Sequence, residues 1–194
     1  DYHFRERKDI QALDGQEQYI VMEVRGDLQA LDIQELKEKL QTGDVFFEGN
    51  PFVGRILQTN KNLKDINKLS AFMAPLSREE IRALLAPANN ANIEKIVTEM
   101  MRRKLLRRTR KQKGELSLKD LENIETRASS AFQELKDAHH FDYVIPNHDG
   151  EDSENWDAFY YPLADARKAL LAFSELLQGH VTNHMEKWEA DLLE

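Results

Sequence analysis

The chain has 194 residues, of which 41% are hydrophobic and 32% are charged, and it carries a formal net charge of −8 at neutral pH. This length and apolar content allow one core of ordinary size. The acidic balance argues against a general nucleic-acid binder, because neutralising phosphates requires a basic surface. No apolar run approaches the roughly 20 residues that span a bilayer, no secretory leader is visible, and there is no cysteine. We therefore expect a cytoplasmic protein with no membrane or DNA partner, no disulfide and no thiolate metal site.

The first half of the chain alternates between apolar runs and helical patterns. Runs with β-branched or aromatic residues predict strands at 18–24, 44–48 and 68–74. Asp32 and Gly43 predict the N-cap and the C-terminal stop of the helix between them.

Three further helices are predicted in this half. Asn50 followed by proline favours a helix that starts near Phe52. The sequence Ser-Arg-Glu-Glu at 77–80 is a capping box, and it opens a helix that ends at Leu85. A short helix at 5–13 stops at an Asp-Gly turn.

The second half opens with two long helical patterns. The first covers residues 92–111 and is broken at Gly114, and Ser117 with Asp120 starts the second. An apolar run at 141–147, FDYVIPN, predicts a short buried strand because a Pro-Asn turn closes it.

An acidic loop at 148–157 and two helices complete the predicted elements. Proline favours a helix start at 162, and this helix runs to 178. A final amphipathic helix is predicted at 182–193, and we expect its apolar residues to pack on the domain. Strands that alternate with helices and have continuous apolar patterns indicate a mostly parallel sheet covered on both faces. The predicted fold class is therefore α/β.

One stretch of the chain is strongly basic. Residues 102–113, RRKLLRRTRKQK, contain eight Lys or Arg residues and no acid, which leaves −16 for the rest of a chain that carries −8 in total. Three interpretations stay open. The stretch is a solvated helix face paired with neighbouring carboxylates, a segment that grips phosphate, or a patch that binds RNA or a membrane surface.

Two short motifs imitate ligand sites only in part. Residues 49–55 are placed like a phosphate-binding loop, but arginine stands where that loop needs lysine, and Ile56 stands where it needs a hydroxyl. His180 and His184 have the i, i+4 spacing of zinc ligands, but no carboxylate follows in the manner of a zinc protease, so we predict no metal site there.

Five segments, taken in order, resemble the guanylate kinase family over residues 1–149. The first four are DYHF, EVRGD, DVFFEGNPFVG and AFMAPLSREEIRALL. The fifth is Arg127-x-x-x-Ala131-x-x-Glu134 followed by FDYVIPNHD, which is similar to the family's signature between its lid and its final strand.

The resemblance implies a P-loop kinase-like parallel sheet flanked by helices, with a helical lid and a C-terminal helical extension. A monophosphate-binding region would cover about 1–43, and the core would cover 44–90 and 127–149. The basic lid would cover about 92–126. The acidic loop and the C-terminal helices at 150–194 would pack on this domain.

The resemblance also implies an activity. Such a kinase moves the γ-phosphoryl group of ATP, with Mg²⁺, to a nucleoside monophosphate or a related phosphate acceptor, mostly by positioning and charge stabilisation. The family's guanine-reading glutamate falls at Ile20, and Glu23 is its nearby substitute. The implied site residues are the catalytic Arg127, Arg110 and Arg108, the ATP-side Asn147, and the substrate-binding Tyr2, Glu23, Glu48 and Asn50.

The family's first strand, phosphate-binding loop and following helix would precede Asp1, and we expect about 35–60 further residues there. Two other functions stay open beside the kinase. One is a guanylate-kinase-like module that kept the fold, lost the chemistry and binds a partner protein. The other is a domain that contacts RNA through residues 102–113. The phosphate acceptor and the formation of a homo-oligomer also stay open.

Overall fold

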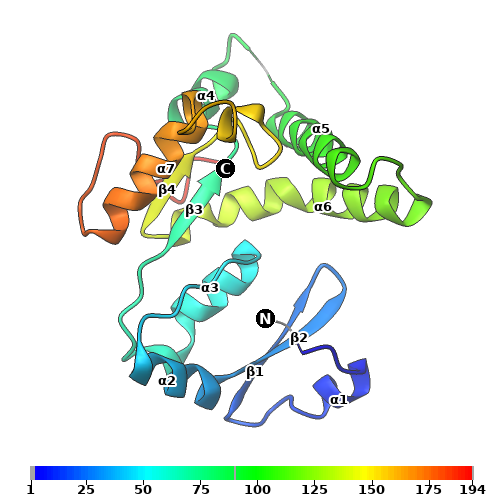
Figure 1. The fold of residues 1–194 in the computed structure, drawn as a ribbon, viewed down its shortest axis with the longest axis vertical. Helices are drawn as coiled ribbons and strands as arrows, with labels where there is room; N and C mark the ends of the chain where they lie inside the picture. Colours follow the sequence, from blue (N-terminus) through cyan, green and yellow to red (C-terminus); the bar gives the residue numbers. More distant parts are fainter. Residues whose placement is uncertain (1–2, 90, 194) are drawn as a thin grey trace. The chain divides into compact units, whose positions relative to one another are not determined.

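The structure is a computed structural model that describes residues 3–89 and 91–193. The chain divides into two compact units, Asp1–Lys68 and Leu69–Glu194 (Figure 1). The described residues form an α/β protein with seven α-helices and two sheets of two strands each. The predicted α/β class is confirmed. The expected mostly parallel sheet is not, because one pair is antiparallel and only the other is parallel.

None of the helices in the described part of the chain is long and apolar enough to cross a bilayer.

The first unit is a β-hairpin packed against short helices. A buried cluster holds it together, in which Ile20, Met22 and Val24 of the first strand meet Ile33 and Val53 from two helices. Alternate residues of that strand are buried, which is typical of a strand with one face on a core. Its elements are α1 (Arg7–Gln11), β1 (Tyr19–Val24), β2 (Asp27–Asp32), α2 (Ile33–Thr42), α3 (Pro51–Thr59) and the 3₁₀-helix η1 (Lys61–Leu63).

The hairpin turns over two residues, Arg25 and Gly26. Val24 is paired with Asp27 across the strands, and both turn residues have positive φ, 53° and 90°. Two consecutive positive φ angles give a tight turn whose twist matches that of the strands. Strand β2 was not predicted from the sequence, because its mixture of polar and apolar residues becomes a strand only beside β1.

Local capping signals in this unit were predicted correctly. The Asp32 carboxylate accepts hydrogen bonds from the backbone N–H groups of Gln34 and Glu35, at 2.9 and 3.1 Å, and so caps α2. Asn50 caps α3 by accepting from the backbone N–H of Phe52 at 2.9 Å. These signals lie within three residues of the groups that they satisfy.

The strand predicted at 44–48 is wrong. Residues 44–49 have no regular secondary structure, and Val45, Phe46 and Phe47 are 39%, 72% and 45% exposed. An extended apolar run becomes a strand only when a neighbouring strand supplies hydrogen-bond partners. The two strands described in this unit pair with each other and not with this run.

The second unit is built on two parallel strands. Their register pairs Phe72 with Val144, and the start of the pair is locked by Ser70, which donates from its backbone N–H and its hydroxyl to Asp142 at 2.8 and 2.7 Å. The elements are β3 (Ala71–Ala74), α4 (Arg78–Leu85), α5 (Ile93–Lys113), α6 (Leu118–Lys136), the 3₁₀-helix η2 (Asp137–His140), β4 (Tyr143–Pro146), the 3₁₀-helix η3 (Glu154–Trp156) and α7 (Ala164–Leu177).

Helices cover both faces of this strand pair (Figure 1). On one face Phe72 and Val144 pack in a cluster with residues of α4, α5 and α6. On the other face Ile145 packs against Ala169, Ala172 and Leu176 of α7. Parallel strands are buried in this way because the chain between them must cross over one face.

The crossover contains a long helical hairpin, α5–α6. Leu105 and Ile124 are buried between the two helices, and Arg102 makes a bidentate ion pair with Glu125 at 2.7 and 2.8 Å. Ser117 and Asp120 form the predicted capping box that starts α6. The helix boundaries expected around the break at Gly114 are therefore confirmed.

The helix predicted at 182–193 is wrong, although its packing is confirmed. Glu186 exchanges two backbone hydrogen bonds of 2.8 Å with Val144, so this segment runs beside β4 as an isolated bridge. Met185, Trp188 and Leu192 are buried, as expected for the apolar face of that segment. The edge of β4 supplies backbone partners that compete with those of a helix.

Candidate functional site

A polar loop follows β4 at the carboxyl end of the parallel pair. The backbone N–H of Asn147 donates to the carbonyl of Ala74 at 2.8 Å, which carries the pairing one residue past β4. The side chain of Asn147 then accepts from the backbone N–H of Asp149 at 3.1 Å and turns the chain. Open parallel sheets bind ligands outside the carboxyl ends of their strands. A ligand-binding site is therefore expected at this loop.

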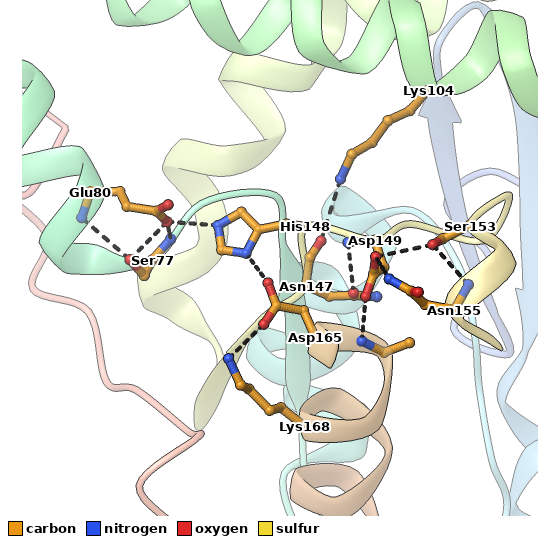
Figure 2. Close-up of polar contacts among 11 residues, drawn as sticks. Ser77, Glu80, Lys104, Asn147, His148, Asp149, Ser153, Asn155, Asp165 and Lys168 are labelled. Carbon is orange, nitrogen blue, oxygen red and sulfur yellow. Dashed lines mark hydrogen bonds and ion pairs between the residues drawn. The ribbon is translucent and has the colours of Figure 1, made fainter. Parts of the chain in front are cut away.

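His148 bridges two carboxylates from different elements (Figure 2). Its Nε2 lies 2.7 Å from Glu80 in the first turn of α4, and its Nδ1 lies 2.5 Å from Asp165 in the first turn of α7. Lys168 donates to the other oxygen of Asp165 at 2.7 Å. Glu80 also accepts from Ser77 and completes the capping box of α4. One imidazole thus joins the loop to the starts of two helices.

The protonation of this bridge follows from its contacts. Burial lowers the pKa of His148, but the hydrogen bonds to Glu80 and Asp165 outweigh it and raise that pKa above 6.5. The pKa of Asp165 is lowered, first by Lys168 and also by His148. Burial raises the pKa of Glu80, but bonds from Ser77 and His148 lower it overall. Both ring nitrogens donate only in the imidazolium form, so the charged histidine fits this arrangement.

Asp149 organises the rest of the loop. One carboxylate oxygen accepts from Asn155 at 2.6 Å and Ser153 at 3.0 Å, and the other accepts from the backbone N–H of Ala166 at 2.7 Å. Burial raises the pKa of Asp149, and these hydrogen bonds more than offset it, so the pKa is lowered overall. The last bond serves the N-terminus of α7, whose N-cap residue, Leu163, makes no side-chain cap.

Cations of α5 reach this loop from the helical hairpin. The ammonium of Lys104 donates to the carbonyl of Asn147 at 3.4 Å, and burial lowers its pKa despite nearby Asp152 and Asp149. Arg107 and Arg108 follow Lys104 by three and four positions. Arg107 lies 3.2 Å from Asp152, and Arg108 lies 2.8 Å from Glu151. The spacing i, i+3, i+4 puts these three cations on one face of the helix.

The cations and acids of this region balance each other. Lys104, Arg107, Arg108 and Lys168 carry four positive charges, and protonated His148 adds a fifth. Five carboxylates face them, those of Glu80, Asp149, Glu151, Asp152 and Asp165. The net charge of these ten groups is therefore zero when His148 is protonated.

The structure brings two of the predicted catalytic or ATP-side residues to this loop. Arg108 reaches it through Glu151, and Asn147 is part of it. Arg110 is exposed in the last turn of α5, and Arg127 lies partly buried on α6. The roles given to all four stay predictions.

The predicted substrate-binding residues belong to the first unit. Tyr2 lies outside the described residues. Glu23 is exposed on β1 and pairs with Arg7 at 3.3 Å. Glu48 is exposed in the irregular segment before α3, and Asn50 uses its side-chain oxygen to cap that helix. The substrate-binding roles given to Glu23, Glu48 and Asn50 stay predictions.

The residues present do not form a magnesium site. Within 3–89 and 91–193, no group of three or more His, Asp or Glu side chains is arranged to hold a metal ion. The carboxylates near Asn147 are already engaged by His148, lysine, arginine or backbone donors.

Sequence reasoning did not single out Lys104, Glu80 or Asp165 as members of this site. Lys104 was noted only as one charge in a basic run, although its spacing to Arg107 and Arg108 shows that the three share a face. Glu80 was recognised as a cap, and nothing in the sequence connects it to His148, which is 68 positions away. Asp165 lies in a helix whose place on the sheet was unknown.

Comparisons of the chain with protein-family models, with curated proteins and with solved structures find no match. The fold and the site define an α/β protein in which a basic helical hairpin meets a charge-balanced loop at the carboxyl end of two parallel strands.

Proposed function

We propose that this chain is part of a guanylate-kinase-like phosphotransferase of the cytoplasm. It would move the γ-phosphoryl group of ATP to a nucleoside monophosphate or a related phosphate acceptor. One observation carries the proposal. The basic hairpin α5–α6 lies in the crossover between the parallel strands β3 and β4. Cations of α5 contact the loop that follows β4, at the carboxyl ends of these strands. A hairpin in this connection can bring its cations to phosphates bound beyond the carboxyl ends of the two strands.

The chemistry of the helix face agrees with phosphate binding. Phosphoryl transfer depends on cations that hold the phosphates in place and offset the charge of the transition state. Arg108 and Arg107 present planar guanidinium groups, which match phosphate oxygens in pairs. Lys104 adds a partly buried ammonium between them and Asn147.

The free edge of β3 supports a kinase-like sheet. Within the described residues β3 pairs with β4 on one side and with no strand on the other. An unpaired edge that lies between two helical layers is a template for a further strand. In the proposal this strand carries the phosphate-binding loop, and Mg²⁺ comes with the bound nucleotide and that loop.

A ligand panel on the full-length protein tests the proposal. Thermal unfolding is followed with ATP, ADP and four nucleoside monophosphates, each with Mg²⁺, and a ligand at a hundred times its Kd stabilises by about 2.7 kcal/mol. We expect Arg108→Gln to reduce the effect of ATP. Arg103→Gln is the matched control, because Arg103 is exposed on the same helix and pairs with Glu99 within it. A panel in which no nucleotide stabilises the chain contradicts the proposal.

The ion pairs of α5 favour a second candidate, a protein-binding module that kept the fold and lost the chemistry. Arg102, Arg107 and Arg108 are all paired with carboxylates, as structural charges are. A phosphoryl-transfer assay on the same full-length protein separates the two candidates. Nucleotide binding without any phosphoryl transfer to the monophosphates supports the module.

A further inference from the structure

We propose that the acidic turn at 149–152 is a built-in competitor that occupies the phosphate-binding face of α5 until a phosphate ligand displaces it. This inference rests on the proposed function, because it assumes that the α5 cations bind phosphate. It adds that the chain's own carboxylates, in the turn at 149–152, pair with those cations when no ligand is bound.

Two ion pairs connect the turn to the helix. Glu151 lies 2.8 Å from Arg108, and Asp152 lies 3.2 Å from Arg107. The two carboxylates are consecutive in the turn and the two guanidinium groups are consecutive in the helix. A phosphate ligand that binds both arginines therefore meets both carboxylates at once.

The carboxylates differ in how firmly they are held. The side chain of Glu151 is 61% exposed, whereas that of Asp152 is only 4% exposed. Asp152 also interacts electrostatically with Lys104. A buried carboxylate is stable only beside positive charge, so Asp152 stays paired with its cations when no ligand is bound. Glu151 is the group that exchanges easily with solvent or ligand.

The backbone of the turn is fixed without help from these ion pairs. Asp149 anchors it to α7 through Ala166, and the Trp156 indole donates to the Gly150 carbonyl at 2.5 Å. Gly150 has a φ of +65°, and a Cβ there would lie 3.4 Å from the side chain of Lys104. The turn is thus held against α5, and competition takes place between side chains.

Phosphate has the charge to displace the turn. A terminal phosphate carries about −1.5 to −2 charges near neutral pH, with three acceptor oxygens, whereas each carboxylate carries at most one. The ligand would also free Glu151 and Asp152 to separate from the arginines. Binding should therefore release these two side chains while the backbone of the turn stays anchored by Asp149 and Trp156.

The test measures binding of inorganic tripolyphosphate by calorimetry at low salt, with the wild-type chain and three variants. Glu151→Gln removes the exposed competitor, and we expect it to tighten binding about fivefold, the size expected for one exposed ion pair. Asp152→Asn should tighten binding further where circular dichroism shows it folded. Glu154→Gln is the matched control, because Glu154 is an exposed acid of the same loop with no ion pair to α5, and it should bind as the wild type does.

The outcomes separate this inference from the proposed function. Equal binding by the wild type, Glu151→Gln and Glu154→Gln overturns the competitor and leaves the phosphate site standing. Absence of binding in all of them overturns the phosphate-binding role of α5, and the competitor falls with it.

Discussion

His148 lies 2.5 Å from Asp165, and this contact ties the second residue after β4 to the first turn of α7. On its other side the same ring contacts Glu80 of α4. In the imidazolium form each nitrogen donates to a carboxylate, whereas the neutral ring has only one N–H to give. The contact therefore makes the packing of three elements depend on a single proton.

The stability of the second unit should fall as the pH rises through the titration of His148. Its folded-state pKa is raised above 6.5, so its stabilisation is complete below pH 6.5 and is lost above the folded-state value. The pKa values of Glu80 and Asp165 are lowered from 4.5 and 3.8, so their part is present above those values and is lost as the pH falls. We expect the bridge to stabilise the second unit most between about pH 4.5 and pH 6.5, where His148 is protonated and both carboxylates are ionised.

Urea unfolding of the wild type and His148→Gln checks this at about pH 5.5 and about pH 9. The variant should be less stable by about 1 kcal/mol at the lower pH, because the ring is partly exposed, and by less at the higher pH. Both tryptophans, Trp156 and Trp188, lie in the second unit, so their fluorescence reports its unfolding. An equal loss at both pH values would contradict the charged bridge.

Asp149→Ala should destabilise the second unit by about 1–2 kcal/mol. The substitution removes three hydrogen bonds, one of which serves the start of α7, and helix caps and bonds to charged acceptors each contribute about this amount. Urea unfolding by tryptophan fluorescence measures it. Asp157→Ala, in the same loop but exposed, should change the free energy of unfolding by less than about 0.5 kcal/mol.

Leu135→Ala should lower the free energy of unfolding by about 2–5 kcal/mol, because Leu135 is 1% exposed in the cluster that covers β3 and β4. Leu118→Ala is the control on the same helix. Leu118 is 73% exposed, so its loss should stay within about 0.5 kcal/mol. Similar losses from both substitutions would mean that α6 does not pack on the strands as described.

Gly26→Ala should weaken the β1–β2 hairpin. Gly26 has a φ of +90°, where an alanine is strained by about 1–2 kcal/mol. Backbone hydrogen exchange of β1 and β2 should rise about tenfold, since each 1.4 kcal/mol corresponds to a factor of ten. Gly43→Ala is the comparison, because Gly43 is extended and a Cβ there would meet nothing within 4 Å. Unchanged exchange in Gly26→Ala would contradict the turn.

Elements defined by short-range signals could be predicted from the sequence. The caps at Asp32, Asn50, Ser77 and Ser117 act on backbone groups two or three residues away, so the helices start where the pattern indicates. Apolar residues were also correctly expected to be buried, as Trp188 and Leu192 show.

Elements that depend on a distant partner could not be predicted. Residues 44–48 have a strand pattern but lack a paired neighbour in the structure, and residues 182–193 have a helical pattern but pair with β4 instead. The site has the same limit. The sequence indicated Arg108 and Asn147, but the contact of His148 with Glu80 exists only once β3 and β4 are side by side.

The parallel pairing of β3 with β4 also has a kinetic consequence. Ser70 meets Asp142 across 72 positions of chain, and closing so long a segment is slower than forming contacts between neighbours. The hairpin α5–α6 lies within that segment and needs only local contacts. We therefore expect the hairpin to fold early and bring the two strands together, so that its helix boundaries set the refolding rate of the whole unit.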